Sequence, residues 1–350
     1  QRQGAAVAAT TIDGVALVLG VVVLFGTCRA LGAPSGRALP AMVVAPRTVP
    51  RMMAFFSGSW QVGLIAGPVL GGFLYVVSPS APFVASAGLL LVAGLLLLTL
   101  TYDPDADLAT DDRDGPGDRP GLRSALEGLR FVRRTPILLG AISLDLFAVL
   151  FGGAVALLPA IATDRLGVGA VGLGWLRAAG GIGAALTTAF LAARPLRRRV
   201  GRKLFAAVAV FGLATIVLGV TRTYAVAVAA ILLLSAADAV SVFVRVSLVP
   251  LVTPNEVRGR VFAVENVFIG ASNELGGFES GVAAALLGVP VAVALGGVAT
   301  LLVVGLWSWW FPALRDVDHF TDLGGTPADR GTTLEAATAI EAERQDGNPL

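Results

Sequence analysis

Charged residues are scarce in this chain, and their scarcity limits what the protein can be. Asp, Glu, Lys and Arg make up 14% of the 350 residues, whereas 55% of the residues are hydrophobic. The mean hydropathy is +0.80. A soluble globule of this length would have too few polar side chains to cover its surface. The composition therefore indicates an integral membrane protein.

Residue types that carry out chemistry are also rare. Cys28, His319 and Lys203 are each alone in their type, so an intrachain disulfide is excluded. The sequence contains no HExxH, Walker A or GxSxG motif, on which metal-dependent hydrolysis, ATP-driven pumping or serine hydrolysis would depend. A GxGxxG pattern at 167–172 follows an apolar run rather than a strand, in a chain with 43 glycines. We therefore predict no enzyme activity, no metal and no cofactor.

Long apolar runs fill most of the chain. Runs of about 20 residues are long enough for helices that cross a bilayer, whereas an outer-membrane barrel would show shorter, alternating segments. Breaks at Gly, Pro and clusters of charge predict nine membrane-spanning helices in an all-α fold. The predicted spans are 14–38, 55–77, 82–100, 137–161, 170–192, 204–219, 224–246, 261–287 and 289–311.

Two polar stretches divide the chain. The first, 101–136, is acidic at its start, and in 121–134 apolar residues share one helical face while Arg and Glu share the other. This pattern predicts an amphipathic helix on the cytoplasmic surface, with a solvated linker as the alternative. The second stretch, 315–350, is polar, and we predict a disordered cytoplasmic tail. The predicted organisation is the remainder of an N-terminal bundle (1–100, three spans), a linker (101–136), a six-helix bundle (137–314) and the tail.

Arginine clusters indicate the orientation in the membrane. They fall in alternate loops, near 47–51, 130–134, 194–203 and 258–260. Loops rich in Lys and Arg remain in the cytoplasm. We therefore predict a multi-pass membrane protein with a cytoplasmic C-terminus.

One predicted span carries more polar groups than a lipid-facing helix allows. Within 258–287, Glu265, Ser272 and Glu279 form one helical stripe, and Asn266, Asn273 and Ser280 form the next; Glu274 points elsewhere. A carboxylate in hydrocarbon costs roughly 2.5–3.5 kcal/mol, so this face must contact protein or water. We interpret it as part of a functional pathway. A packed interface with ion pairs is the alternative.

Other spans also contain ionisable residues far from their ends. Arg245 and Glu265 lie closer to the predicted cytoplasmic ends, where their side chains could reach the membrane interface. The deeper groups must pair with one another or line a wet cavity, because lipid cannot solvate them. These deeper groups are Arg29, Asp145, Arg177, Asp238, Glu274 and Glu279.

The second span contains a glycine motif that points to a family. Gly63, Gly67, Pro68, Gly71 and Gly72 match the pattern G-x-x-x-G-P-x-x-G-G. The pattern resembles the antiporter signature in the fifth helix of the major facilitator superfamily. Glycines permit close helix contact and proline bends a helix, which suits a hinge between two bundles. Ordinary small-residue packing is the alternative.

Further segments resemble the enterobactin-exporter-like group within this superfamily. The stretches 144–153, 258–261 and 270–281 are similar to its seventh and eleventh helices, although Gly277 replaces an expected acidic residue. Gly201, Arg202 and Lys203 are similar to the end of the superfamily's cytoplasmic loop motif, in which Arg198 replaces an aspartate. Arg29 resembles the arginine of the R-x-x-Q-G motif, although the glutamine is absent.

The resemblance implies a twelve-helix transporter, of which this chain would contain the fourth to twelfth helices. It implies alternating access between two six-helix bundles in a bacterial inner membrane, with proton-coupled export of a small molecule such as a siderophore or a drug. The expected partners are the lipid bilayer, the substrate and protons, and no nucleic acid. A non-transporting receptor or scaffold, and an importer of the same fold, are the alternatives.

Site residues are predicted on the same basis. Asp145 and Asp238 are the first candidates for proton or substrate coupling. Glu274 and Glu279, with Asn273, come next. Arg29 and Arg177 are expected either to hold an anionic substrate or to neutralise the acids.

Overall fold

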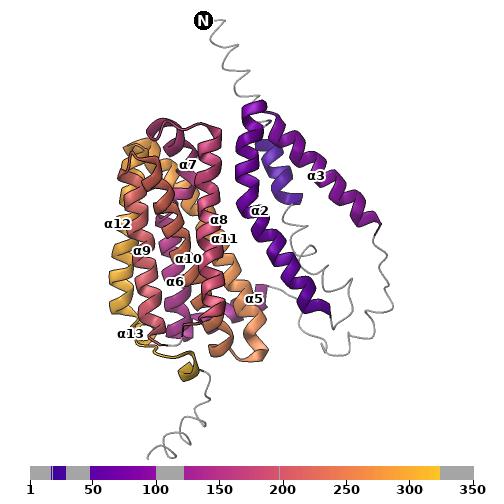
Figure 1. The fold of residues 1–350 in the computed structure, drawn as a ribbon. Helices are drawn as coiled ribbons and strands as arrows, with labels where there is room; N and C mark the ends of the chain where they lie inside the picture. The colour runs from indigo at the N-terminus through magenta and orange to yellow at the C-terminus, as the bar shows by residue number, and fades with distance from the viewer. Residues whose placement is uncertain (1–16, 18, 29–47, 100–121, 197, 324–350) are drawn as a thin grey trace, which may run out of the picture. The chain divides into compact units, whose positions relative to one another are not determined.

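The computed structural model describes residues 17, 19–28, 48–99, 122–196 and 198–323, and these residues form helices and loops without a strand (Figure 1). This confirms the predicted all-α fold. The chain divides into two compact units, 1–62 with 90–115 and 63–89 with 116–350. Each unit is described by itself below.

Seven of the described helices are long and apolar enough to cross a membrane. They confirm seven of the predicted spans. The helix α11 (Asn255–Leu287) has 33 residues and is also long enough, but its polar residues lower its hydropathy. Of the first predicted span, 14–38, the structure describes an apolar helix at Leu19–Cys28. The seven are α2 (Val49–Val77), α3 (Ala81–Leu98), the broken helix Pro136–Arg165 that starts with α6, α8 (Ala170–Ala193), α9 (Val200–Val220), α10 (Tyr224–Val252) and α12 (Val289–Trp310).

The helices from α6 (Pro136–Phe151) to α12 pack into a bundle. In this bundle α9 packs against α10 and α12, α10 also packs against α8, and α6 packs against α11 and α12. Small residues allow these close contacts, as is usual between membrane helices. A Cβ atom on Gly183 of α8 would lie 2.2 Å from the carbonyl oxygen of Leu232 on α10. A glycine is therefore required at this crossing.

The predicted span 137–161 is not one continuous α-helix. The helix α6 ends at Phe151, and the chain continues through η3 (Ala154–Leu157), α7 (Leu158–Ala160) and a π-turn, η4 (Ile161–Arg165). The break lies at Gly152 and Gly153, where a Cβ atom on Gly153 would meet Ser280 Oγ on α11 at 2.6 Å. Gly153 therefore allows α11 to lie directly against the end of α6, and Gly152 leaves room for Phe211 of α9.

The predicted amphipathic helix is present as α5 (Leu122–Arg134). Its apolar face packs against α11 and α6, because Val132 is buried and Leu129 packs beside it in a cluster that includes Val261. Arg260 on α11 forms an ion pair with Glu127 on α5. Protein thus covers the part of the apolar face around Leu129 and Val132, whereas Leu126 is exposed.

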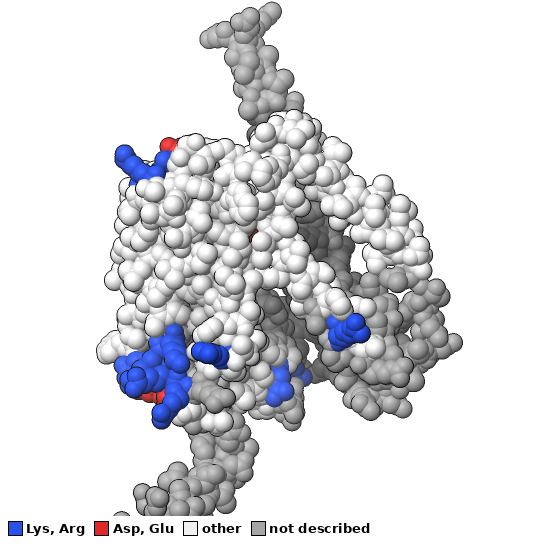
Figure 2. Space-filling view, viewed as in Figure 1, with Lys and Arg blue, Asp and Glu red and all other residues white. Residues whose placement is uncertain are grey.

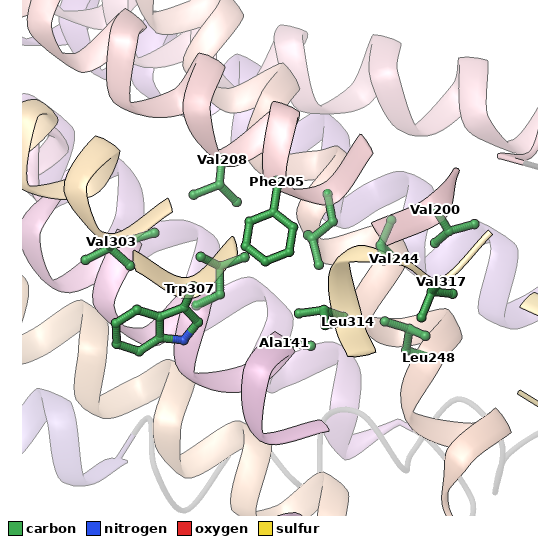
Figure 3. Close-up of a cluster of buried hydrophobic side chains, with 13 residues drawn as sticks. Ala141, Val200, Phe205, Val208, Val244, Leu248, Val303, Trp307, Leu314 and Val317 are labelled. Carbon is green, nitrogen blue, oxygen red and sulfur yellow. The ribbon is translucent and has the colours of Figure 1, made fainter. Parts of the chain in front are cut away.

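The chain after α12 packs against the end of the bundle. We call residues 312–323 the C-terminal strap; it contains α13 (Pro312–Arg315) and η5 (Phe320–Leu323). Leu314 and Val317 are buried beside Val200 and Leu248 (Figure 3). The backbone N–H groups of Val200 and Gly201 donate to the carbonyl oxygens of Asp318 and Val317, at 3.2 and 3.0 Å. We expected the chain from residue 315 onward to be disordered, whereas its first part is folded here; residues 324–350 lie outside the described residues.

Basic side chains gather at the same end of the bundle. Figure 2 shows a group of Lys and Arg side chains near α13, whereas most of the bundle surface above it carries no charge. The group includes exposed residues of the α8–α9 loop and of the first turn of α9. These residues are Arg194, Arg198, Arg199, Arg202 and Lys203.

Candidate functional site

Arg245 is the centre of a buried group of charges inside the bundle. Its side chain is 4% exposed; Nη2 lies 2.9 Å from Asp145 Oδ1, and Nη1 lies 3.5 Å from Glu265 Oε1. Asp238 interacts electrostatically with both Asp145 and Arg245, although it forms no ion pair among the described residues. We call Asp145, Asp238, Arg245 and Glu265 the charge cluster. It joins α6, α10 and α11, which are far apart in the sequence.

Helical spacing explains why these side chains meet. On α6, Asp145 shares its face with Ala141 and Ala148, which are buried in the bundle core. On α10, Asp238 and Arg245 are seven residues apart, so they point to the same side about two turns apart. The charge cluster therefore forms where the buried faces of α6, α10 and α11 converge.

A small cavity lies next to the charge cluster. It has a volume of about 10 Å³ and lies between α6, α9 and α10, with Asp145, Asp238 and Ser241 among its lining residues. Ser241 Oγ and Arg245 Nε are buried and have no hydrogen-bond partner among the described residues. The site thus combines ionisable groups with unused hydrogen-bonding capacity.

Carboxylates outnumber cations in the charge cluster. Three acids lie around one arginine: Asp145 and Glu265 form ion pairs with it, and Asp238 interacts with it only electrostatically. Full ionisation would leave two negative charges uncompensated in the interior of an apolar bundle. Such charges are costly unless they are paired, hydrated or neutralised by protonation. The arrangement can therefore hold and release a proton, and its protonation would change the forces between α6, α10 and α11.

The structure brings two of the deep ionisable residues together and corrects the expectation for two others. It brings Asp145 and Asp238 together, as a shared site requires. The expectation that Arg245 and Glu265 reach the membrane interface is wrong, because they are 4% and 5% exposed and bind each other inside the bundle. The spacing of seven residues between Asp238 and Arg245 was the available signal for a shared face.

The other predicted residues do not join the charge cluster. Asn273, Glu274 and Glu279 on α11 are exposed, as is Arg177 on α8. None of the three charged residues forms an ion pair within the described ranges, and Asn273 Nδ2 donates to the carbonyl oxygen of Ile269 at 2.8 Å. Arg29 lies outside the described residues. Arg177 therefore does not neutralise the buried acids in this structure.

The polar stripes of α11 are divided between buried and exposed positions. Glu265, Ser272 and Ser280 are buried, whereas Asn266, Asn273 and Glu279 are exposed. The Oγ of Ser272 donates to the carbonyl oxygen of Ile269 at 3.0 Å. The stripe that starts with Glu265 is thus buried in the bundle as far as Ser272 and is exposed at Glu279, toward the end of the helix.

The glycine motif predicted from the sequence lies within one helix. The glycine motif lies in the middle of α2, and Pro68 lies inside this helix. Its remaining members are Gly63, Gly67, Gly71 and Gly72.

The loop motif begins α9. A Cβ atom on Gly201 would lie 1.9 Å from the carbonyl oxygen of Leu314, so the first turn of α9 fits directly against the strap. Arg202 and Lys203 are exposed beside it. Arg199 precedes the helix with φ 55°, a left-handed conformation that is uncommon for a residue with a side chain.

The Arg199 backbone N–H donates to Asp318 Oδ1 at 2.7 Å. This hydrogen bond lowers the pKa of the Asp318 carboxyl below its ordinary value. The side chain of Arg315 lowers the pKa of Asp316 in the same way, by hydrogen bonding and by its charge. The Asp318 carboxylate thus links the strap to the start of α9 at neutral pH, whereas Asp316 binds a neighbour within the strap.

Apolar membrane-length helices that bury carboxylates around an arginine are typical of membrane proteins that move ions or solutes, since such groups are rare in membranes and mark pathways. The comparisons with known proteins agree. Residues 4–234 match the model of the Major Facilitator Superfamily, and the chain therefore belongs to this superfamily of transporters. Its members are transporters rather than enzymes, which confirms the prediction that the chain is not an enzyme.

A curated relative is similar over part of the chain. Multidrug resistance protein 1 of Bacillus subtilis (strain 168) is 27% identical over 128 residues, which are 37% of this chain and 32% of the relative. The match thus covers about one third of the relative. The narrower placement in the enterobactin-exporter-like group stays a prediction.

Proposed function

We propose that the protein is a secondary exporter of small molecules, driven by protons that enter through the charge cluster. The observation that carries this proposal is the excess of acids around Arg245: Asp145 and Glu265 are buried and form ion pairs with it, and the half-buried Asp238 interacts with it electrostatically. Protonating one acid removes a charge from the apolar interior and weakens its attraction to Arg245. A proton can thereby change the relative stability of two conformations of the bundle.

Alternating access requires a helix contact that can change during transport. We assign this contact to the glycine motif of α2, because its glycines allow close helix contact and Pro68 removes one helical hydrogen bond. In this proposal the charge cluster supplies the proton-dependent step.

The substrate is proposed to be a lipophilic drug-like compound or a siderophore. The name of the Bacillus relative refers to multidrug resistance, which favours the first class. Exposed polar residues of the bundle, Arg177, Asn273, Glu274 and Glu279, are the proposed contacts for the substrate. Arg177 would suit an anionic group and the two glutamates a cationic one.

The proposed location is a bacterial plasma membrane with the basic end of the bundle in the cytoplasm. The arginines near α13 support this orientation under the positive-inside rule (Figure 2). The C-terminal strap would then also lie on the cytoplasmic side.

The test is dye transport by the protein, expressed with its complete reading frame, in everted membrane vesicles. We expect ethidium to accumulate in the vesicles when a proton gradient is imposed and to be released by a protonophore. Asp145→Asn and Asp238→Asn should abolish accumulation. Asp164→Asn is the matched control, because Asp164 is exposed in the π-turn and distant in sequence from the charge cluster.

Two outcomes would contradict the proposal. Gradient-driven accumulation that is unchanged in both cluster variants would exclude these carboxylates from proton coupling. The assay is repeated with a panel of dyes and ferric catecholates. If these compounds and ethidium bind but none shows gradient-dependent flux, the protein is a receptor or scaffold.

A further inference from the structure

Ser241 is a buried polar group that the proposed function does not use. It lies on α10 between Asp238 and Arg245, three residues after the first and four before the second, and thus on the same helical face. Its side chain is 3% exposed, and Oγ has no hydrogen-bond partner among the described residues. Buried hydroxyl groups in proteins almost always have a partner, which can be an ordered water molecule.

The cavity beside Ser241 has the size and polarity that suit one water molecule. Its volume of about 10 Å³ lies at the lower limit for holding a single water, which also needs two to four polar partners. Asp145, Asp238 and Ser241 line the cavity and supply three such partners. A divalent cation would need about six oxygen ligands, and the described residues contain no group of three or more metal-binding side chains.

We propose that one water molecule occupies this cavity, bonded to Asp145, Asp238 and Ser241, and that it relays protons between the two aspartates. This inference rests on the proposed proton-coupled function. When Asp238 is protonated, its O–H gives the proton to the water oxygen, and the same water gives one of its own protons to the Asp145 carboxylate. Asp238 becomes a carboxylate, Asp145 becomes neutral, and the water is regenerated.

The charged groups around the cavity determine which ion pair breaks when the relay moves a proton. Two charged groups line it, Asp145 from α6 and Asp238 from α10. Arg245 from α10 contacts Asp145 behind the lining, and Glu265 from α11 contacts Arg245 in turn. The helix α9 contributes only apolar residues, Val208 and Phe211. A proton that reaches Asp145 therefore ends its ion pair with Arg245, which keeps its ion pair with Glu265 and its electrostatic interaction with the newly charged Asp238. Ser241 acts as a positioning residue that fixes the water between the two carboxyls.

Infrared spectroscopy of the purified protein tests the inference without a transport substrate. An acid titration should produce the C=O band of protonated carboxyl groups, and the Asp145→Asn and Asp238→Asn variants assign that band. Ser241→Val fills the cavity with methyl groups, so we expect the band to move to higher frequency as a hydrogen bond is lost. We also expect hydrogen–deuterium exchange of the assigned carboxyl to slow by about tenfold, a factor of the size that one hydrogen bond supplies.

Two matched variants separate the relay from general damage to the bundle. Ser241→Ala removes the hydroxyl without adding bulk and should produce a band shift in the same direction. Ser247→Ala lies on the same helix, where its Oγ donates to the carbonyl oxygen of Phe243 at 2.8 Å, and should leave band and exchange unchanged.

Each result decides the inference. A band and an exchange rate that stay the same in Ser241→Val and Ser241→Ala as in the wild type would overturn it. So would a wild-type spectrum with no assignable carboxyl band at any pH. Failure of the proposed function is distinguishable, because it appears as missing gradient-driven ethidium flux in the wild type, whatever the infrared spectra show.

Discussion

Replacing Arg245 with methionine is the sharpest test of how the charge cluster contributes to stability. Methionine keeps much of the length of the side chain but removes the guanidinium that contacts Asp145 at 2.9 Å and Glu265 at 3.5 Å. All three side chains are at most 8% exposed. The variant therefore leaves buried carboxylates without their counter-ion.

The expected loss follows from this burial. Removing one partner of a buried ion pair costs about 3–5 kcal/mol, because the remaining charge has neither water nor a partner. For a unit of this size, such a loss lowers the melting temperature by roughly 6–20 °C. Acidic pH should recover part of it, because protonation neutralises the carboxylates that Arg245 no longer balances.

Thermal unfolding in detergent, followed by tryptophan fluorescence at neutral and acidic pH, measures the effect. Arg222→Met is the control, because Arg222 is exposed between α9 and α10 and forms no ion pair within the described part of the chain. We expect the control to change stability by less than about 0.5 kcal/mol. If Arg245→Met melts at the same temperature as the control, the charge cluster is not the tightly buried network described here.

Three further predictions concern other contacts of the bundle. Leu314→Ala should destabilise the protein by about 2–5 kcal/mol in the same assay, because this fully buried side chain anchors the strap. Asp318 has a lowered pKa, so its contact with Arg199 stabilises the strap fully above the carboxyl's ordinary pKa and is lost as the pH falls through the lowered value. We therefore expect proteolysis of the strap to become faster as the pH falls through this range, and Asp318→Asn should remove this dependence on pH. Trp307→Phe should cost about 0.5–1.5 kcal/mol, because its Nε1 donates to Ser143 Oγ at 2.8 Å, and Trp309→Phe, at an exposed position, should cost less.

The sequence predicted the helices better than their contacts. Runs of apolar residues located seven membrane-length helices, and the cost of burying charge singled out Asp145 and Asp238. The role of Arg245 was missed, because its nearness to the end of its span suggested that the side chain would reach water. Periodicity within one helix does not reveal which neighbour that helix meets, and Arg245 binds residues of α6 and α11.

The break in the span that begins with α6 was missed for a related reason. Glycine pairs are frequent in this chain, and they also occur inside continuous helices, as at Gly276 and Gly277. At Gly153 the close approach of α11 requires the absence of a side chain, as the approach of Phe211 on α9 does at Gly152. The sequence alone does not show that approach.

The C-terminal strap did leave a signal in the sequence. Leu314, Val317, Phe320 and Leu323 recur at every third position within a stretch that is otherwise polar. All four pack into or against the bundle core. The polar composition of the whole segment concealed this short pattern, because composition averages over many more residues than the strap contains.

The strap has a practical consequence for handling the protein. A reporter or affinity tag fused directly after Trp310 would replace the residues that shield Val200 and Leu248. It would expose an apolar surface where α9 begins and α10 ends. Fusions joined beyond Leu323 would keep that surface covered. Reporters that assign membrane sidedness from the carboxyl end should accordingly be attached at the later junction.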